Sequence, residues 1–286
     1  MKIIMFLAGW LGISYSALAQ LTYGAGIGTT GYSGDVNDVS IGSARYSING
    51  DVGYKVNDML ELYGSATFYE ISAKDAVPQR NINFRSRNLE AYVGARFFLT
   101  SPYKTFVTYK TDVLLPYFYG GVGVTTIDPY ARDGKGEYVS MRQLRLEGRP
   151  VPSSAAIYPI GFGLRLRLTQ AFYINAEGGL RFVNSDMLDG IMTDKVKSKD
   201  ISPEARSFIA SLGQTQSNLV NAMNSTDATG GFVYKNGNPA RKDLYGIFQL
   251  RVEFIPAASA KQSEFKYRGR SASSIYHRRK PSRRLK

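Results

Sequence analysis

The segment of residues 89–99 reads Leu-Glu-Ala-Tyr-Val-Gly-Ala-Arg-Phe-Phe-Leu, and every second residue, beginning with Leu89, is apolar. One face of an extended chain would carry the apolar residues Leu89, Ala91, Val93, Ala95, Phe97 and Leu99. The opposite face would carry the charged residues Glu90 and Arg96. Because successive side chains of a strand point to opposite sides, this period of two predicts a β-strand with one apolar face and one charged face.

The same alternation returns along the chain, which has 286 residues. It is clear in residues 160–168, 172–182 and 244–254, and weaker in residues 21–32, 46–56, 59–69 and 115–127. We therefore expect an all-β protein with eight strands, and no long segment has the 3.6-residue period of a helical bundle. A soluble sandwich also alternates, with its apolar face hidden, so alternation alone leaves the architecture open.

The lengths of the strands and of their connections favour a transmembrane barrel. The strand candidates are about ten residues or longer, which is the tilted span of a bilayer. Two connections are tight turns, at residues 57–58 and 169–170, whereas three are long, at residues 71–85, 128–155 and 184–241. Bacterial outer-membrane barrels have this asymmetry, with short periplasmic turns and long extracellular loops.

Aromatic residues near the predicted strand ends fit the same architecture. We expect an aromatic girdle, the belt that transmembrane barrels place at each membrane interface. Its predicted members are Tyr46, Tyr69, Tyr117, Phe118, Phe172 and Tyr173.

The charged faces of the strands would meet inside such a barrel. The predicted lumen network consists of Asp51, Glu61, Glu90, Arg96, Arg165, Arg167, Glu177, Arg181, Arg251 and Glu253. An eight-stranded antiparallel barrel has an interior just wide enough to be filled by side chains. Opposite charges should pair there, because an unpaired buried charge is costly. We therefore expect a filled lumen, and a narrow channel is the alternative.

The two ends of the chain suggest an export signal and a tail. Lys2, an apolar stretch at residues 3–13 and Ala17-Leu18-Ala19 have the order of a secretory signal peptide, which predicts a signal peptide at residues 1–19. The barrel would then occupy residues 20–255, including a long extracellular loop with a short helix at residues 184–241. Residues 256–286 would form a basic periplasmic tail, with both termini on the periplasmic side of the outer membrane.

The tail carries most of the positive charge of the chain. Residues 261–286 hold ten Lys and Arg against one Glu, a charge of +9 out of a total of +13. Such a segment could bind an acidic protein, anionic lipid or nucleic acid, or remain solvated. Nucleic acid fits poorly with a secreted barrel, so we favour a periplasmic protein. The candidate partner-binding residues are Arg268, Arg270, Arg278, Arg279, Lys280, Arg283 and Arg284.

Several chemistries lack the residues that they require. The chain has no cysteine, and its one histidine, His277, lies in the tail, so neither a thiolate metal cluster nor a Ser-His-acid triad is indicated. The glycines Gly26, Gly28 and Gly31 match a nucleotide-binding pattern in letters only, because they lie within a predicted strand. We expect no catalytic residue, no cofactor, no metal and no small-molecule substrate.

One helix is predicted within the longest loop. Ser202 is a suitable N-cap and Pro203 a suitable first-turn residue, followed by apolar residues such as Phe208 and Leu212. The helix would be either a surface lid for a partner or a loop that packs its own apolar side chains over the barrel mouth. The second interpretation is favoured.

The order of several short motifs resembles the PorG-like outer-membrane barrels of the type IX secretion system in Bacteroidota. The motifs are Tyr32-Ser33-Gly34-Asp35, residues 115–124 with Asp128-Pro129, residues 160–164, residues 177–181 with residues 186–189, and Gly237-Asn238-Pro239. The resemblance implies a non-enzymatic component that associates with a periplasmic ring of the PorK lipoprotein and PorN. The alternative is a stand-alone outer-membrane barrel, an adhesin or a membrane-stabilising protein, whose only partner is the lipid.

Overall fold

The computed structural model describes residues 21–34, 44–74, 83–99, 114–145, 149–169, 171–190, 202–211 and 242–256. The predicted signal peptide and the seven candidate residues of the basic tail lie outside these ranges, as does most of the predicted loop at residues 184–241. The structure does not describe those segments.

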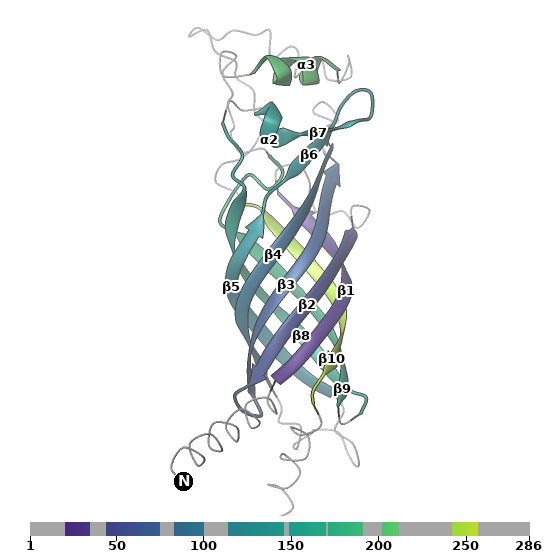
Figure 1. The fold of residues 1–286 in the computed structure, drawn as a ribbon, viewed down its shortest axis with the longest axis vertical. Coiled ribbons are helices and arrows are strands. Elements are labelled where there is room, and N and C mark those ends of the chain that lie inside the picture. The colour runs from purple at the N-terminus through teal and green to yellow at the C-terminus, as the bar shows by residue number, and fades with distance from the viewer. Residues whose placement is uncertain are drawn as a thin grey trace, which may run out of the picture.

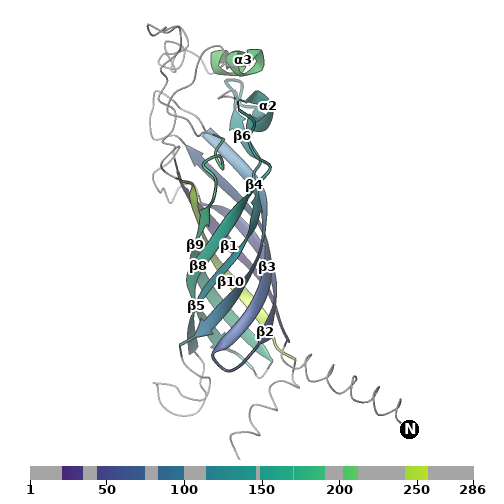
Figure 2. The same ribbon diagram turned by 90° about the vertical axis from the view of Figure 1, so that its left-hand side faces the viewer.

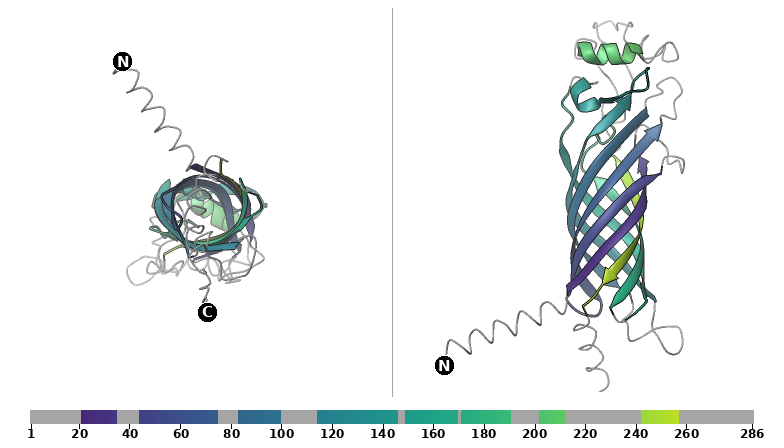
Figure 3. Two further views of the ribbon diagram at one scale, coloured as in Figure 1. Left: turned by 90° about the horizontal axis from the view of Figure 1, so that it is seen from below. Right: turned by 45° about the vertical axis from the view of Figure 1, so that its right-hand side comes forward.

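Eight long strands close into an antiparallel barrel in the part of the chain that the structure describes (Figure 1). They are β1 (Leu21–Ser33), β2 (Arg45–Lys55), β3 (Leu60–Lys74), β4 (Asn83–Phe98), β5 (Leu114–Thr126), β8 (Ser154–Arg167), β9 (Phe172–Val183) and β10 (Leu244–Phe254). Around the ring the order is β3, β2, β1, β10, β9, β8, β5 and β4, and the pairing of β3 with β4 closes it. The view along the barrel axis in Figure 3 shows the closed ring. The predicted fold class is confirmed.

The strands β3 and β4 run further than the sequence pattern indicated. They pair without interruption from Leu60 with Phe97 to Lys74 with Asn83, so residues 71–74 and 83–85 of the predicted loop are strand, and the loop prediction is wrong for them. The reason is that the alternation is inverted here: the apolar Ile71 and Ala73 lie on the inward parity of β3, and the polar Glu70 and Ser72 lie on the outward parity.

A small cap extends beyond the end of the barrel at which β4 begins (Figure 2). The short strand β6 (Pro129–Arg132) pairs with β4, and β7 (Tyr138–Ser140) pairs with β6. Two helices follow, α2 (Met141–Leu144) and α3 (Pro203–Ser211). The predicted loop at residues 128–155 therefore contains ordered elements.

The predicted helix start is confirmed. The backbone N–H of Ala205 donates to Ser202 Oγ at 3.0 Å, and the same hydroxyl donates to the carbonyl of Leu144 at 3.0 Å. Phe208 is buried in an apolar cluster that includes Met141 and Leu144 of α2. These contacts favour the interpretation in which the loop packs its own apolar side chains.

The surface of the barrel is the reverse of that of a soluble sandwich. Apolar side chains face outward, with Ile27 69%, Val93 64% and Phe248 55% exposed, whereas Glu61 and Arg96 inside are fully buried. No helix in the described ranges is long and apolar enough to cross a membrane.

Three of the six predicted girdle residues face the interior of the barrel instead of the outside. Tyr69 and Tyr117 are fully buried, and Tyr173 lies on the inner face, where its ring centroid is 6.0 Å from the Arg165 guanidinium. Tyr46, Phe118 and Phe172 are exposed, as predicted. The error has a simple cause: neighbours on a strand point to opposite faces, so of an adjacent aromatic pair only one member can face outward.

Candidate functional site

The charged lumen is the most distinctive site in the described part of the chain. Nine of the ten predicted network residues have buried side chains there. They are Asp51 of β2, Glu61 of β3, Glu90 and Arg96 of β4, Arg165 of β8, Glu177 and Arg181 of β9, and Arg251 and Glu253 of β10. Six of the eight strands thus send charges into one interior, as their period of two requires.

Arg96 binds carboxylates from two neighbouring strands. Its Nη2 lies 2.6 Å from Asp51 Oδ2 and its Nη1 lies 2.6 Å from Glu61 Oε1. The guanidinium also stacks over the ring of Tyr63, 3.8 Å from the ring centroid. The planar fork of arginine suits this arrangement, because its donors point in two directions at fixed angles.

Two further arginines extend the network across the lumen. Arg165 Nη1 lies 3.0 Å from Glu61 Oε2, and its Nη2 lies 2.6 Å from Glu253 Oε2. Arg251 joins Asp51 at 3.0 Å to Glu177 at 3.4 Å. The four carboxylates Asp51, Glu61, Glu177 and Glu253 therefore share three guanidinium groups, and Lys55 of β2 supplies a further positive charge near Glu61 and Glu253.

Neutral side chains complete this network. The hydroxyl of Tyr117 donates to Glu177 Oε2 at 2.8 Å, and the amide of Gln249 donates to Glu177 Oε1 at 2.9 Å. Asn175 accepts from Arg165 Nε at 3.0 Å and donates to Glu253 Oε2 at 3.0 Å. The sequence analysis missed these three residues, although each lies on the inward parity of its strand, and that parity would have found them.

A second, smaller group involves Glu90 and Arg181. Arg181 Nη2 lies 3.5 Å from Glu90 Oε1, and the hydroxyl of Tyr245 donates to Glu90 Oε2 at 2.6 Å. The ring of Tyr245 is stacked on that of Tyr69, with centroids 4.7 Å apart. Aromatic rings and one ion pair, whose two charges cancel, thus fill the part of the lumen around Glu90.

Two glycines of β1 make room for the ion pair between Asp51 and Arg251. A Cβ atom at Gly24 would overlap Asp51 Oδ1, and one at Gly26 would overlap Arg251 Cγ. The glycines at residues 24 and 26 are therefore required by the packing of the lumen.

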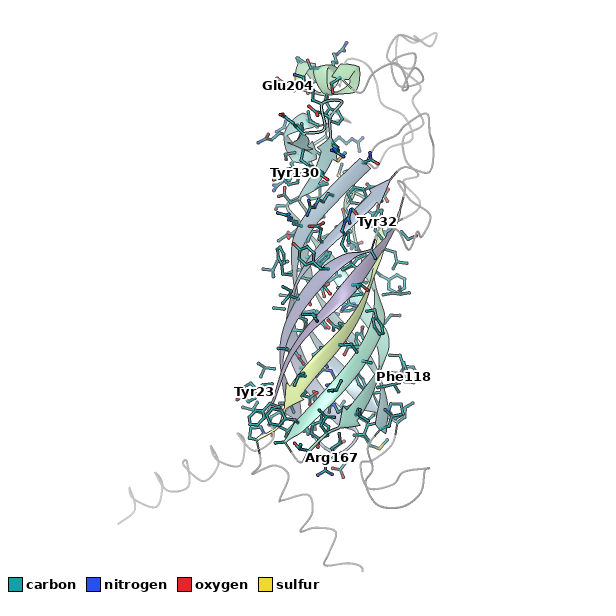
Figure 4. The ribbon with its side chains drawn as sticks, turned by 90° about the vertical axis from the view of Figure 1, so that its right-hand side faces the viewer. Tyr23, Tyr32, Phe118, Tyr130, Arg167 and Glu204 are labelled. Carbon is teal, nitrogen blue, oxygen red and sulfur yellow. The ribbon has the colours of Figure 1, made fainter. Side chains whose placement is uncertain are left out.

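Arg167 does not join the network, and the prediction is wrong for this residue. It is the last residue of β8, and its Nε donates to the carbonyl of Thr169 in the adjacent turn at 3.2 Å. Figure 4 shows it at the end of the barrel. At this position the side chain can reach water, so no buried carboxylate is needed to pair it.

The cap carries a second feature, a polar groove of about 630 Å³ on its surface. Tyr130, Tyr138, Arg142 and Arg145 are among its lining residues. The nearby Asp128 carboxylate raises the pKa of the Tyr130 hydroxyl above its ordinary value.

The carboxylates of the lumen are arranged as ion-pair partners of arginines. The described residues contain no group of three or more His, Asp or Glu side chains that could hold a metal ion. Each of the four carboxylates of the larger network has an arginine partner within 4.0 Å. A carboxylate held in this way is a poor base, because its paired charged form is stabilised.

Comparisons with known proteins return the fold alone. No family model matches the chain, and no curated protein matches it. Among solved structures, Neisserial surface protein A is 11% identical over 82% of this chain and 97% of its own, with a TM-score of 0.42. The attachment invasion locus protein Ail of Yersinia pestis is 11% identical, covering 82% and 96%, with a TM-score of 0.39. The outer membrane protein OprG of Pseudomonas aeruginosa is 9% identical, covering 82% and 95%, with a TM-score of 0.37.

Proposed function

We propose that this protein is a non-enzymatic outer-membrane barrel that carries nothing through its lumen and anchors a protein assembly on the periplasmic side. The observation that supports this most strongly is the closed ring of eight strands, apolar outside and filled inside by paired charges. A filled lumen supports a role other than transport, and anchoring is the role that we favour.

The exterior of the barrel fits a lipid bilayer. Only helices and closed barrels satisfy all backbone hydrogen bonds within a membrane, and here every strand of the ring has two partners. Aromatic side chains stand on the outside near one end, where Phe172 contacts Phe254 with ring centroids 5.2 Å apart and Tyr23 is 42% exposed. Figure 4 places Tyr23 and Phe118 toward the end opposite to the cap.

The orientation follows from the turns. The tight turn between β2 and β3 and the turn between β8 and β9 lie at the end where β1 begins and β10 finishes, since Tyr23 pairs with Phe254 and Leu21 with Tyr54. Short turns of bacterial barrels are periplasmic. Both termini, and with them the basic tail, would then be periplasmic, and the cap would face outward.

The particular role that we favour is that of a PorG-like component of the type IX secretion system. The tail would hold the periplasmic ring of PorK-like and PorN-like proteins through Arg278, Arg279, Lys280, Arg283 and Arg284. The support is the resemblance of the sequence motifs and the concentration of +9 charges beyond the barrel. The proposal includes no cofactor, no nucleic acid and no small-molecule substrate.

A stand-alone surface barrel is the second candidate, and the cap favours it. The cap forms an ordered surface at the end of the barrel opposite the chain termini. It consists of the hairpin of β6 and β7, the two helices and the groove lined by Tyr130, Tyr138 and Arg142. An adhesin would use this end and would need no periplasmic partner.

Affinity purification of the native protein in mild detergent separates the two candidates. Three forms would be compared: the full chain, a chain ending at residue 260, and a full-length chain with the five named tail residues changed to Gln. The secretion proposal predicts that PorK-like and PorN-like proteins accompany the full chain and are lost from both other forms. Recovery of the barrel alone, under conditions that preserve the ring, would favour the surface barrel.

A further inference from the structure

Three arginines converge on one carboxylate at the cap end of the barrel. Arg85 Nη2 lies 2.6 Å from Glu70 Oε2, Arg87 Nε lies 3.1 Å from the same oxygen, and Arg45 Nε lies 3.4 Å from Glu70 Oε1. The residues come from β2, β3 and β4, so the cluster joins three neighbouring strands.

The cluster has an excess of positive charge. The side chain of Glu70 is only 2% exposed, because the arginines cover it, whereas those of Arg45, Arg85 and Arg87 are 44%, 32% and 57% exposed. Three guanidinium groups and one carboxylate leave a charge of +2. One carboxylate neutralises only one of the three positive charges, although all three arginines contact it.

Arg85 is held in place but not saturated. Its guanidinium lies over the ring of Tyr138 at 5.8 Å from the centroid. Its Nε is buried and has no hydrogen-bond partner among the residues that the structure describes. Glu70 and Tyr138 thus hold the guanidinium in place, while the side chain remains 32% exposed and can meet an anion outside the barrel.

The arginine cluster lies at the edge of the apolar outer band of the barrel. Arg85 and Arg87 alternate with buried residues of β4 and lie on the same outer face as Leu89 and Val93. Leu89 is 51% exposed, and the next outward position above it is Arg87. On the adjacent strands the exposed aromatics Tyr46 and Phe68 contact each other, with ring centroids 6.2 Å apart. The apolar band therefore ends where the arginines begin.

We propose that Arg85 and Arg87 bind the phosphate group of an anionic lipid in the outer leaflet, whose acyl chains lie on the apolar band below, and that Arg45 contributes through its ion pair with Glu70. This inference rests on the proposed membrane location and orientation. The arginine fork matches phosphate oxygens through paired charge-assisted hydrogen bonds. Glu70 positions the three guanidinium groups, and the charge of +2 that remains is complementary to a phosphate.

Native mass spectrometry of the full-length protein, released from detergent with added diphosphorylated lipid A, tests the proposal. The variant Arg85→Gln/Arg87→Gln should bind lipid A about tenfold more weakly or worse, because it loses two positive charges and their charge-assisted hydrogen bonds to the phosphate. Arg85→Lys/Arg87→Lys keeps the charge and loses the fork, so it should fall between that variant and the native protein. Gel mobility with and without heating verifies that each barrel is folded.

The matched control is Arg132→Gln/Arg142→Gln, which removes two exposed arginines from the cap. It should bind lipid A as the native chain does. Equal binding by the native protein and Arg85→Gln/Arg87→Gln, or an equal loss in the control, would overturn the proposal. Inorganic phosphate in large excess should not displace lipid A, and full displacement would overturn the assignment to a lipid.

The same samples keep this inference separate from the anchoring role. Arg85→Gln/Arg87→Gln should still co-purify with the periplasmic ring, and the chain ending at residue 260 should still bind lipid A. Loss of lipid A binding in the truncated chain would place the anion site in the tail and contradict the cluster on the barrel.

Discussion

Arg96 and Glu61 form an ion pair of 2.6 Å in which neither side chain is exposed at all. The pair joins β4 to β3, which are neighbours in the ring, and Arg165 of β8 reaches the same carboxylate from across the barrel. Buried charges of this kind add little net stability over apolar packing, but removing one partner is strongly destabilising. The lumen therefore depends on the balance of its charges.

Substitution of a buried arginine should cost more than substitution of an arginine at the end of the barrel. Arg96→Met removes the partner that lies 2.6 Å from both Asp51 and Glu61 and should lower the free energy of unfolding by about 3–5 kcal/mol. Arg167→Met is the matched control, since the side chain of Arg167 bonds to the adjacent turn and should cost less. Urea unfolding in lipid vesicles, followed by circular dichroism, measures both. Equal losses would show that the ion pairs of the lumen do not stabilise the barrel.

The glycines of β1 provide a test of lumen packing. Gly24→Ala would overlap Asp51 and should destabilise the barrel by about 1–3 kcal/mol, the usual cost of overpacking. A Cβ atom at Gly50 or Gly64 would meet nothing within 4 Å, so Gly50→Ala and Gly64→Ala should leave the midpoint of unfolding unchanged. If the three variants behaved alike, the close approach of Asp51 to β1 would not matter for stability.

A filled lumen predicts that the barrel does not conduct ions. Purified protein inserted into planar bilayers should give no stable current steps, whereas a porin inserted under the same conditions should. Steady conductance that Arg96→Met increases would show that the charges line a channel instead of closing it.

The sequence predicted the architecture well, because eight strands retain a strict alternation over most of their length. It failed where the alternation is inverted, as at residues 70–73 of β3, and where two aromatics are adjacent, as at Tyr117 and Phe118. The inward parity identified Arg96 and Glu61 as lumen residues but not as partners, since pairing depends on the register between strands. The cluster around Glu70 was missed for the same reason, because its members are brought together only by the ring.

The central claim is that the outer face of the barrel contacts lipid, and one pair of substitutions tests it directly. Val93 is 64% exposed and lies on the apolar band, whereas Ser207 is an exposed residue of α3 in the cap. The measurement is the fraction of protein that folds into lipid vesicles for Val93→Arg and Ser207→Arg. Val93→Arg should lose about 2–4 kcal/mol of stability in the membrane, and Ser207→Arg should fold as the native chain does. Normal folding of Val93→Arg would contradict the account.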